Sequence, residues 1–391
     1  MIAIANELIV DVMTALLLAL IVSFLATPLV RRLAFKIGAV DIPRDNRRMH
    51  DHPIPRLGGL AIFLGFLVSV LAYARIDMEM QGILIGATII AVLGIADDIH
   101  SLPAKFKFVV QILAALCAVL HGVAIEVIGN PNIFSDSEYW VLGGWSIPVS
   151  VIWIVAITNA VNLIDGLDGL ADGISTIGAL TMLILALILG EHEIALVCGA
   201  LVGACVGFLP YNLNPARIFM GDTGSTFLGF ILACVSIQGL FKYYAVISFL
   251  VPFIILGLPI FDTASAIIRR LLKGQSPMVA DRSHIHHKLI DMGLNQKQAV
   301  ATLYIISGVL GLSAVLLTTS GGAKTALFIL ALVICAVVAV RAIWPHHPED
   351  HHPGAAAEQK GEQGTREEKK PEQPASACEE GAAAKEEKPH E

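Results

Sequence analysis

The amino-acid sequence predicts an all-α polytopic membrane protein with about eleven transmembrane helices. The first observation is composition: 55% of the 391 residues are hydrophobic and 15% are charged, against roughly 25% charged in a soluble domain. The second is that the apolar residues form separate stretches, close to the 20 or so residues that a membrane-crossing helix needs. The third is that Lys and Arg gather in alternate connections between these stretches.

Eleven stretches of mostly apolar residues account for the expected helices. In chain order they are residues 8–30, 57–75, 82–96, 105–121, 147–163, 173–190, 194–211, 223–240, 244–268, 301–319 and 324–344. The first has no Lys or Arg before it and no evident small-residue cleavage site, so we expect a retained span rather than a signal peptide. The third is the shortest. The ninth contains Pro252, Gly257 and Pro259, which predict a bend.

The distribution of Lys and Arg predicts the orientation. With the N-terminus outside, the cytoplasmic connections hold sixteen Lys and Arg residues and the outer connections hold three. This excess is the positive-inside pattern of membrane proteins. One missed span would reverse every later connection and destroy the pattern, so the bias also supports the count of eleven and a cytoplasmic C-terminus.

Two regions of different composition are expected. Residues 1–344 form an integral-membrane domain, and residues 345–391 form a charged cytoplasmic tail without large apolar side chains, which we expect to be disordered. Most of the net charge of −7 comes from this tail. The charge therefore says little about partners, and we expect no nucleic acid among them. The largest outer connection, 122–146, contains alternating apolar residues that predict a short hairpin.

Acidic residues and histidines gather at the cytoplasmic ends of the apolar stretches. They are Asp97, Asp98, Asp165, Asp168, Asp172, Asp222, His284, His286 and His287. Carboxylates are costly close to hydrocarbon, so their repeated placement there indicates a functional site. Because all of them fall in connections on one side of the membrane, we expect one site rather than four.

The first two cytoplasmic connections supply cationic and anionic candidates. Arg56, in the sequence PRLGG, and His50 or His52 are suited to phosphate contacts, although such basic residues also serve merely to anchor the topology. Asp97 and Asp98 are adjacent, and their mutual repulsion would be relieved by a divalent cation or a lysine. A solvated helix end is the alternative interpretation of this pair.

The third connection carries the sequence NLIDGLDGLADG. Asn162, Asp165 and Asp168 recur every three residues, so on a helix they would share one face. Their amide and carboxylate groups could bind a sugar, a base or the water ligands of a metal. Asp-Gly pairs also form tight turns, but a turn needs only one such pair.

The last two connections add a carboxylate and a cationic cluster. Asp222 precedes an apolar helix, where it could cap the helix or lie beside bound phosphate and Mg²⁺. Arg282 is followed by the sequence HIHH, which holds His284, His286 and His287. Without a cysteine or an HxxxH pair these residues do not resemble a zinc site. A cationic cluster suits phosphate oxygens, and a solvated loop is the alternative.

Taken in order, these motifs resemble the polyprenyl-phosphate N-acetylhexosamine-1-phosphate transferase superfamily. The matching elements are PRLGG, the Asp97–Asp98 pair, NLIDGLDGLADG, FMGDTGS and HIHH, and the resemblance covers about residues 10–340. The HIHH form is similar to the WecA/TagO-type members rather than to the MraY-type translocases.

The resemblance implies transfer of a sugar-1-phosphate, by default N-acetylglucosamine-1-phosphate, from a UDP-sugar to undecaprenyl phosphate with release of UMP. It implies Mg²⁺, or Mn²⁺ in its place, held at Asp222 and Asp165. It further implies that Asp97 or Asp98 acts on the lipid phosphate. The implied substrate contacts are Asn162, Asp168, Arg56, His50, Arg282, His284, His286 and His287. A plasma- or inner-membrane location, a cytoplasmic active site, a homodimer and a product that initiates teichoic acid, O-antigen or a similar glycan complete the expectation.

Three other classes of membrane protein compete with this interpretation. An ion-coupled transporter would place acidic residues near the membrane midplane, whereas here they lie at one face. A polyprenyl transferase for an aromatic acceptor would need paired DxxxD-type motifs, whose spacing differs from that found here. A purely structural membrane protein would leave the acidic connections unexplained.

Overall fold

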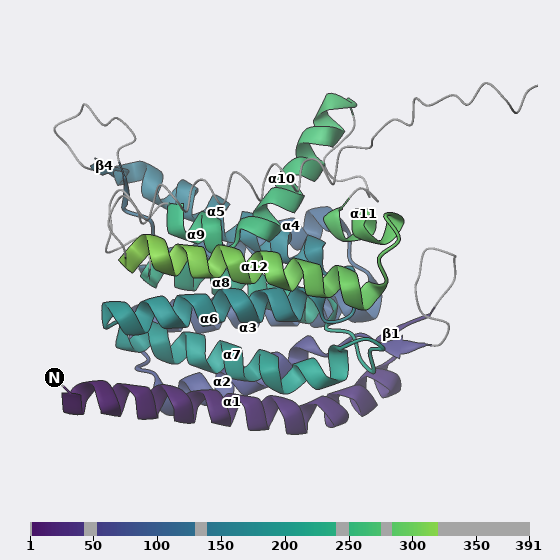
Figure 1. Cartoon of the computed structure of the whole chain (residues 1–391), viewed down its shortest axis with the longest axis horizontal. Helices are drawn as coiled ribbons and strands as arrows, with labels where there is room; N and C mark the ends of the chain where they lie inside the picture. Colours follow the sequence, from purple (N-terminus) through teal and green to yellow (C-terminus); the bar gives the residue numbers. More distant parts are fainter. Residues whose placement is uncertain (1, 43–52, 130–138, 240–249, 275–283, 320–391) are drawn as a thin grey trace, which may run out of the picture. The chain divides into compact units, whose positions relative to one another are not determined.

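The computed structural model describes residues 2–42, 53–129, 139–239, 250–274 and 284–319. All of them belong to one compact unit, Met1–Ile343. Within these ranges the chain is mostly helical (Figure 1). The helices are α1 (Ile2–Ile37), α2 (Gly59–Tyr73), α3 (Met78–His100), α4 (Ala104–Leu120), α5 (Ser146–Ile164), α6 (Leu170–Leu189), α7 (His192–Asn212), α8 (Gly221–Gly239), α9 (Leu250–Ile255), α10 (Gly257–Leu272), α11 (Ile285–Asp291) and α12 (Gln296–Thr319), with a 3₁₀ turn, η1, at Gly143–Trp145.

Six helical segments in the described ranges are long and apolar enough to cross a membrane. They are Glu7–Ile37, Met78–His100, Gly143–Ile164, Leu170–Leu189, His192–Asn212 and Gln296–Thr319, and α2 is a shorter apolar helix. The polytopic helical architecture is thereby confirmed, while the number eleven and the orientation stay predictions. The eleventh apolar stretch, 324–344, and the tail lie outside the described residues.

Two departures from a purely helical chain occur among the described residues. The strands β1 (Val40–Asp41) and β2 (Ile54–Pro55) pair antiparallel, as do β3 (Val127–Gly129) and β4 (Tyr139–Val141). The second pair lies in the connection 122–146, where the alternating pattern predicted a short hairpin. The ninth stretch is also two helices, because α9 ends at Ile255 and α10 begins at Gly257, next to the prolines that predicted a bend.

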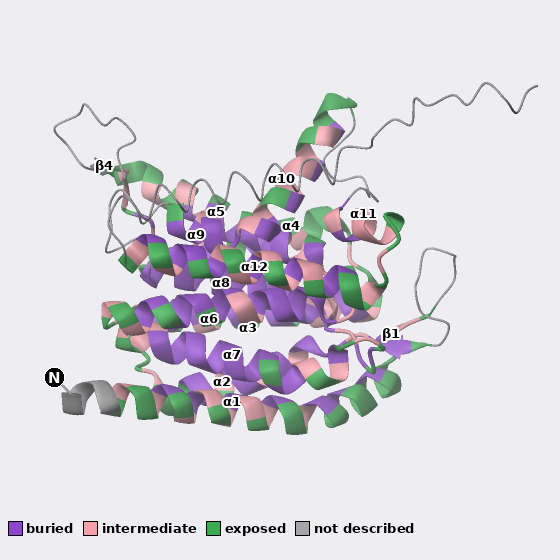
Figure 2. Ribbon diagram, viewed as in Figure 1, coloured by how far each residue is buried: buried purple, intermediate pink, exposed green. Residues whose placement is uncertain are grey.

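Helix α8 forms the centre of the bundle. Every residue from Thr223 to Gly239 is buried (Figure 2), and α8 packs against α3 on one side and α5 on another. Helices α12, α6, α7 and α1 lie side by side in that order, each packed against the next (Figure 1). A helix buried on all sides has no lipid or solvent face, so its first turn can be held rigidly by its neighbours.

Glycines allow α2 and α3 to approach the first turn of α8. The backbone N–H groups of Gly58 and Gly59 donate to the carbonyls of Phe219 (2.9 Å) and Met220 (2.8 Å). A Cβ on Gly59 would overlap the backbone of Gly224, and one on Gly94 would overlap Thr223. The motifs PRLGG and FMGDTGS are therefore adjacent in space, and their glycines permit backbone contact that any side chain would prevent.

We expect Gly59→Ala to destabilise the protein by about 1–3 kcal/mol, because the new methyl group must displace backbone rather than a flexible side chain. Thermal unfolding in detergent should show a lower Tm than wild type. Gly144→Ala is the matched control, since a Cβ there meets nothing within 4 Å. Equal melting temperatures for the two variants would contradict the close packing of α2 on α8.

Candidate active site

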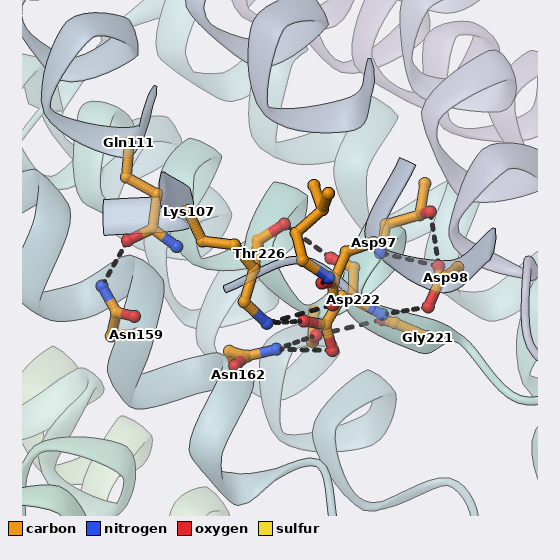
Figure 3. A network of polar contacts seen from close by, with 12 residues as sticks. Asp97, Asp98, Lys107, Gln111, Asn159, Asn162, Gly221, Asp222 and Thr226 are labelled. Carbon is orange, nitrogen blue, oxygen red and sulfur yellow. Dashed lines mark hydrogen bonds and ion pairs between the residues drawn. The ribbon is translucent and has the colours of Figure 1, made fainter. Parts of the chain in front are cut away.

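The N-terminus of α8 lies near the C-terminal ends of α3 and α5 and the N-terminal end of α4. Polar side chains from all four helices contact one another there (Figure 3). The site residues therefore lie mostly in the terminal turns of helices, not in loops as the sequence suggested. Asp97 and Asp98 are in the last turns of α3, and Asp222 is in the first turn of α8. Helix ends are more rigid than loops, so this arrangement fixes the polar groups in place.

Asp98 is engaged by four donors. Its Oδ1 accepts from the backbone N–H of Asp222 (3.0 Å) and from Arg56 Nε (3.3 Å), and its Oδ2 accepts from the N–H (3.1 Å) and Oγ1 (2.6 Å) of Thr223. The backbone N–H groups of Asp222 and Thr223 lie in the first turn of α8, where backbone donors have no carbonyl partner within the helix. Asp98, which is 5% exposed, thus acts as a capping carboxylate for α8 supplied by another helix.

Asp97 faces a different set of groups. Its Oδ1 accepts from the backbone N–H of Leu102 (2.6 Å), and its Oδ2 accepts from Lys107 Nζ (3.0 Å). The same ammonium donates to Asp222 Oδ2 at 2.7 Å. Lys107 on α4 therefore bridges the carboxylates of α3 and α8, and it supplies the lysine that the Asp97–Asp98 pair was expected to need.

Asn162 completes the polar cluster from α5. Its Nδ2 donates to Ser225 Oγ (2.8 Å) and lies 3.3 Å from Asp222 Oδ1. One turn earlier, Asn159 Nδ2 donates to Gln111 Oε1 at 2.7 Å and so links α5 to α4 (Figure 3). Because Gln111 follows Lys107 by one helical turn, this amide pair also holds α4 in register beside the cluster.

The connection after α5 carries Asp165 and Asp168. Helix α5 ends at Ile164, so Asn162, Asp165 and Asp168 do not share a helix face, and that expectation was wrong. A turn orients them instead: Asp168 Oδ2 accepts from Asn214 Nδ2 (2.9 Å) and the backbone N–H of Ala216 (3.0 Å). Burial, and then the negative charges of nearby Asp222, Asp98 and Asp168, raise the pKa of Asp165 to about 8.

These groups line a cavity of about 370 Å³. Seven of the predicted residues lie on its wall, namely Arg56, Asp98, Asn162, Asp165, Asp168, Asp222 and His287. Asp97, His284 and His286 are not on this wall. Two further predicted residues, His50 and Arg282, lie outside the described residues. Most of the charged side chains on the cavity wall are acidic, and the wall also carries the basic Arg56 and the imidazole of His287.

The three histidines occupy three different environments. His287 lines the cavity, whereas His284 is buried and within 2.8 Å of Asp262. His286 is 2% exposed, and burial, followed by the neighbouring His287, lowers the pKa of His286 to about 4. Its imidazole is therefore neutral near pH 7, because dehydration disfavours the charged ring. The expected cationic cluster thus does not include His286.

Sequence reasoning missed Lys107 as a site residue and counted it only as a topological charge. The available signal was a lysine at the very start of an apolar stretch, ten residues after Asp97. An ionisable side chain at a span's edge is costly unless it has a partner. Asn214 and Gln296, which meet beside Asp168, were missed as well.

The oxygen donors fit a hard divalent cation. Carboxylate oxygens of Asp222 and Asp165 and the amide of Asn162 share the cavity wall. Burial and, after it, neighbouring negative charges raise the pKa of Asp165, and a cation would offset those charges. No group of three His, Cys, Asp or Glu in the described ranges is arranged to hold a metal unaided. Mg²⁺ commonly takes only one or two protein carboxylates and completes its shell with water and phosphate. Mn²⁺ accepts the same donors.

The sequence is similar to those of known proteins over most of its length. Residues 80–240 match the model of glycosyl transferase family 4. The chain is 44% identical, over 84% of its length and 91% of the relative, to the probable undecaprenyl-phosphate N-acetylglucosaminyl 1-phosphate transferase of Bacillus subtilis. It is 33% identical to the decaprenyl-phosphate N-acetylglucosaminephosphotransferase of Mycolicibacterium smegmatis, over 82% of this chain and 86% of the relative. It is 30% identical to the undecaprenyl-phosphate alpha-N-acetylglucosaminyl 1-phosphate transferase of Yersinia pestis, over 73% and 79%.

Proposed function

Because the chain belongs to glycosyl transferase family 4, we propose that it transfers N-acetylglucosamine-1-phosphate from UDP-N-acetylglucosamine to undecaprenyl phosphate. The products are undecaprenyl-diphosphate-N-acetylglucosamine and UMP. The relatives' activities support the substrates. The observation that carries the proposal is the polar cluster of Asp97, Lys107, Asn162 and Asp222, the last two of which line the cavity, in a chain with helices long and apolar enough to cross a membrane.

The reaction brings two anions together, and charged groups of the cluster can reduce the repulsion between them. A phosphate oxygen of the lipid forms a bond to the sugar-bearing phosphorus, the bond from that phosphorus to the UMP oxygen breaks, and UMP leaves with the electron pair. Negative charge on both reactants must be screened as they approach. Lys107 and Arg56 supply fixed positive charge beside the acidic residues. Bound Mg²⁺ would add screening of the diphosphate and of the departing UMP.

Each of the predicted groups of residues has a role in this proposal. Asp222, with Asp165 and Asn162, would hold Mg²⁺ or Mn²⁺. Asp168, Arg56 and His287 would contact the nucleotide sugar, and His50 and Arg282 would join them from the first and fifth cytoplasmic connections. Asp97 would orient Lys107 and the attacking lipid phosphate, while Asp98 would hold the first turn of α8.

The membrane arrangement follows from the same reasoning. The active site would face the cytoplasm, where UDP-sugars are made, and the protein would reside in the plasma or inner membrane as a monomer or homodimer. The product would initiate a cell-envelope glycan such as teichoic acid or O-antigen. A lipid phosphate lies at the headgroup level, which is where the ends of α3, α4 and α8 would be.

The test is release of UMP from UDP-N-acetylglucosamine by protein purified in detergent. We expect release only when both undecaprenyl phosphate and Mg²⁺ are present, loss of activity with EDTA, and recovery with Mg²⁺ or Mn²⁺. Release with a different UDP-N-acetyl sugar alone would change the donor and keep the reaction. No release with any of these donors would contradict the proposed function and favour an ion-coupled transporter.

A further inference from the structure

A buried carboxylate outside the cavity holds the histidine segment in place. Asp262 on α10 is 1% exposed. Its Oδ2 lies 2.8 Å from His284 Nδ1, and its Oδ1 accepts from the backbone N–H of Ile285 at 2.9 Å. A carboxylate only accepts hydrogen bonds, so Nδ1 of His284 carries the proton. Both oxygens of Asp262 are therefore committed to the two residues at the beginning of α11.

Helix α11 depends on this contact for its start. It has seven residues, too few for stability by itself. His284, the residue before it, makes no capping hydrogen bond from its own side chain to the helix. Asp262 supplies the missing acceptor, and its negative charge at the N-terminus of α11 is favourable. Asp262 on α10 thus holds the N-terminal end of α11, and the helix also packs against α12.

His286 and His287, which follow His284, connect the start of α11 to the cavity. The rings of His284 and His286 are stacked, with centroids 5.8 Å apart and an 8° interplanar angle, and those of His286 and His287 are 4.3 Å apart. His286 rests against Gly166, where a Cβ would overlap its ring. Gly166 lies between the two carboxylates of the connection after α5, and both Gly166 and His287 line the cavity.

We infer that Asp262 is a positioning residue for substrate binding. It fixes the start of α11 so that His286 packs on the connection after α5 and His287 faces the cavity. This inference rests on the proposed function for its kinetic consequence, because His287 is assigned there to the nucleotide sugar. Asp262 itself does not touch the cavity, and its effect must pass through His284 and α11.

The kinetic test is Asp262→Asn, which keeps the shape of the side chain but places an amide NH₂ against one of two donors. We expect the KM for UDP-N-acetylglucosamine to rise roughly tenfold, with a smaller change in kcat and an unchanged KM for undecaprenyl phosphate. Asp77→Asn is the matched control: Asp77 also caps a helix, accepting from Met80 N–H at 2.8 Å on α3, and its loss should leave both KM values at wild-type level.

A double-mutant cycle distinguishes an effect of Asp262 that passes through His284 from a general loss of structure. If Asp262 acts through His284, the variant carrying both Asp262→Asn and His284→Ala should have a KM for UDP-N-acetylglucosamine no higher than that of the single variant with the higher KM. Fully additive losses would overturn the inference, as would a wild-type KM for UDP-N-acetylglucosamine in Asp262→Asn.

Hydrogen exchange provides a readout that needs no activity. Asp262→Asn should accelerate amide exchange in residues 284–291, with α3, α5 and α8 unchanged. Faster exchange throughout these helices, or unchanged exchange in 284–291, would overturn the positioning role. A wild-type protein inactive with UDP-N-acetylglucosamine would instead contradict the proposed function, and the exchange experiment would still decide whether Asp262 holds α11.

Discussion

Asp222→Asn is expected to lower turnover at least about a hundredfold and to weaken the dependence on Mg²⁺. The substitution keeps only one of the two oxygens that accept from Lys107 and Asn162, and it removes the negative charge that a hard cation requires. Asp222 lies in the cavity beside Asp165 and receives Lys107 at 2.7 Å. In the proposed site its charge would hold the cation as well as balance the lysine, so we expect both roles to fail together in this variant.

The measurement is the initial rate of UMP release as Mg²⁺ is varied, for wild type and Asp222→Asn. A higher Mg²⁺ requirement with low maximal turnover is the expected pattern. Asp77→Asn serves again as the control, because it removes a carboxylate from a helix start outside the polar cluster. Thermal unfolding of Asp222→Asn near the wild-type Tm would show that the fold survives. Near-wild-type turnover in this variant would remove Asp222 from the metal site.

Much of the fold could be predicted because it depends on local composition. Apolar stretches of the right length predicted the helices, and the prolines of the ninth stretch predicted the division between α9 and α10. The short strand β1 and its partner β2 were not predicted, since two-residue strands leave no periodic pattern. The close approach of Gly59 to Gly224 depends on segments about 165 residues apart in the chain, and no local signal encodes that pairing.

The sequence motifs identified seven residues that line the cavity, but they did not identify the contacts between side chains. Motif chemistry found Asp222 and Asn162, but it did not find Lys107, whose significance appears only when α4 packs beside α3. Asp262 was missed because it lies inside an apolar stretch, far in sequence from the acidic motifs. The different roles of Asp97 and Asp98 were also beyond sequence reasoning, since adjacent residues on a helix point about 100° apart, and only packing decides which direction faces which partner.

This difference between Asp97 and Asp98 leads to the second large expected effect. We expect Asp97→Asn to lose at least about a hundredfold in turnover while binding of UDP-N-acetylglucosamine survives. Asn can still accept from the N–H of Leu102, so the end of α3 should stay folded. Lys107 loses one of its two anionic partners, however, and is drawn to Asp222 alone. Its charge is then no longer shared with the position proposed for the lipid phosphate.

Asp98→Asn is the informative comparison, because it makes the same chemical change as Asp97→Asn in different surroundings. The amide NH₂ of Asn would face backbone N–H donors of α8 that the carboxylate now satisfies. Leaving buried donors unpaired costs about 1–3 kcal/mol, so this variant should melt at a lower temperature and lose nucleotide binding with turnover. Calorimetric titration with UDP-N-acetylglucosamine and thermal unfolding of both variants make the comparison. If Asp97→Asn also lost nucleotide binding, Asp97 would have a structural or nucleotide role instead of one confined to the lipid phosphate.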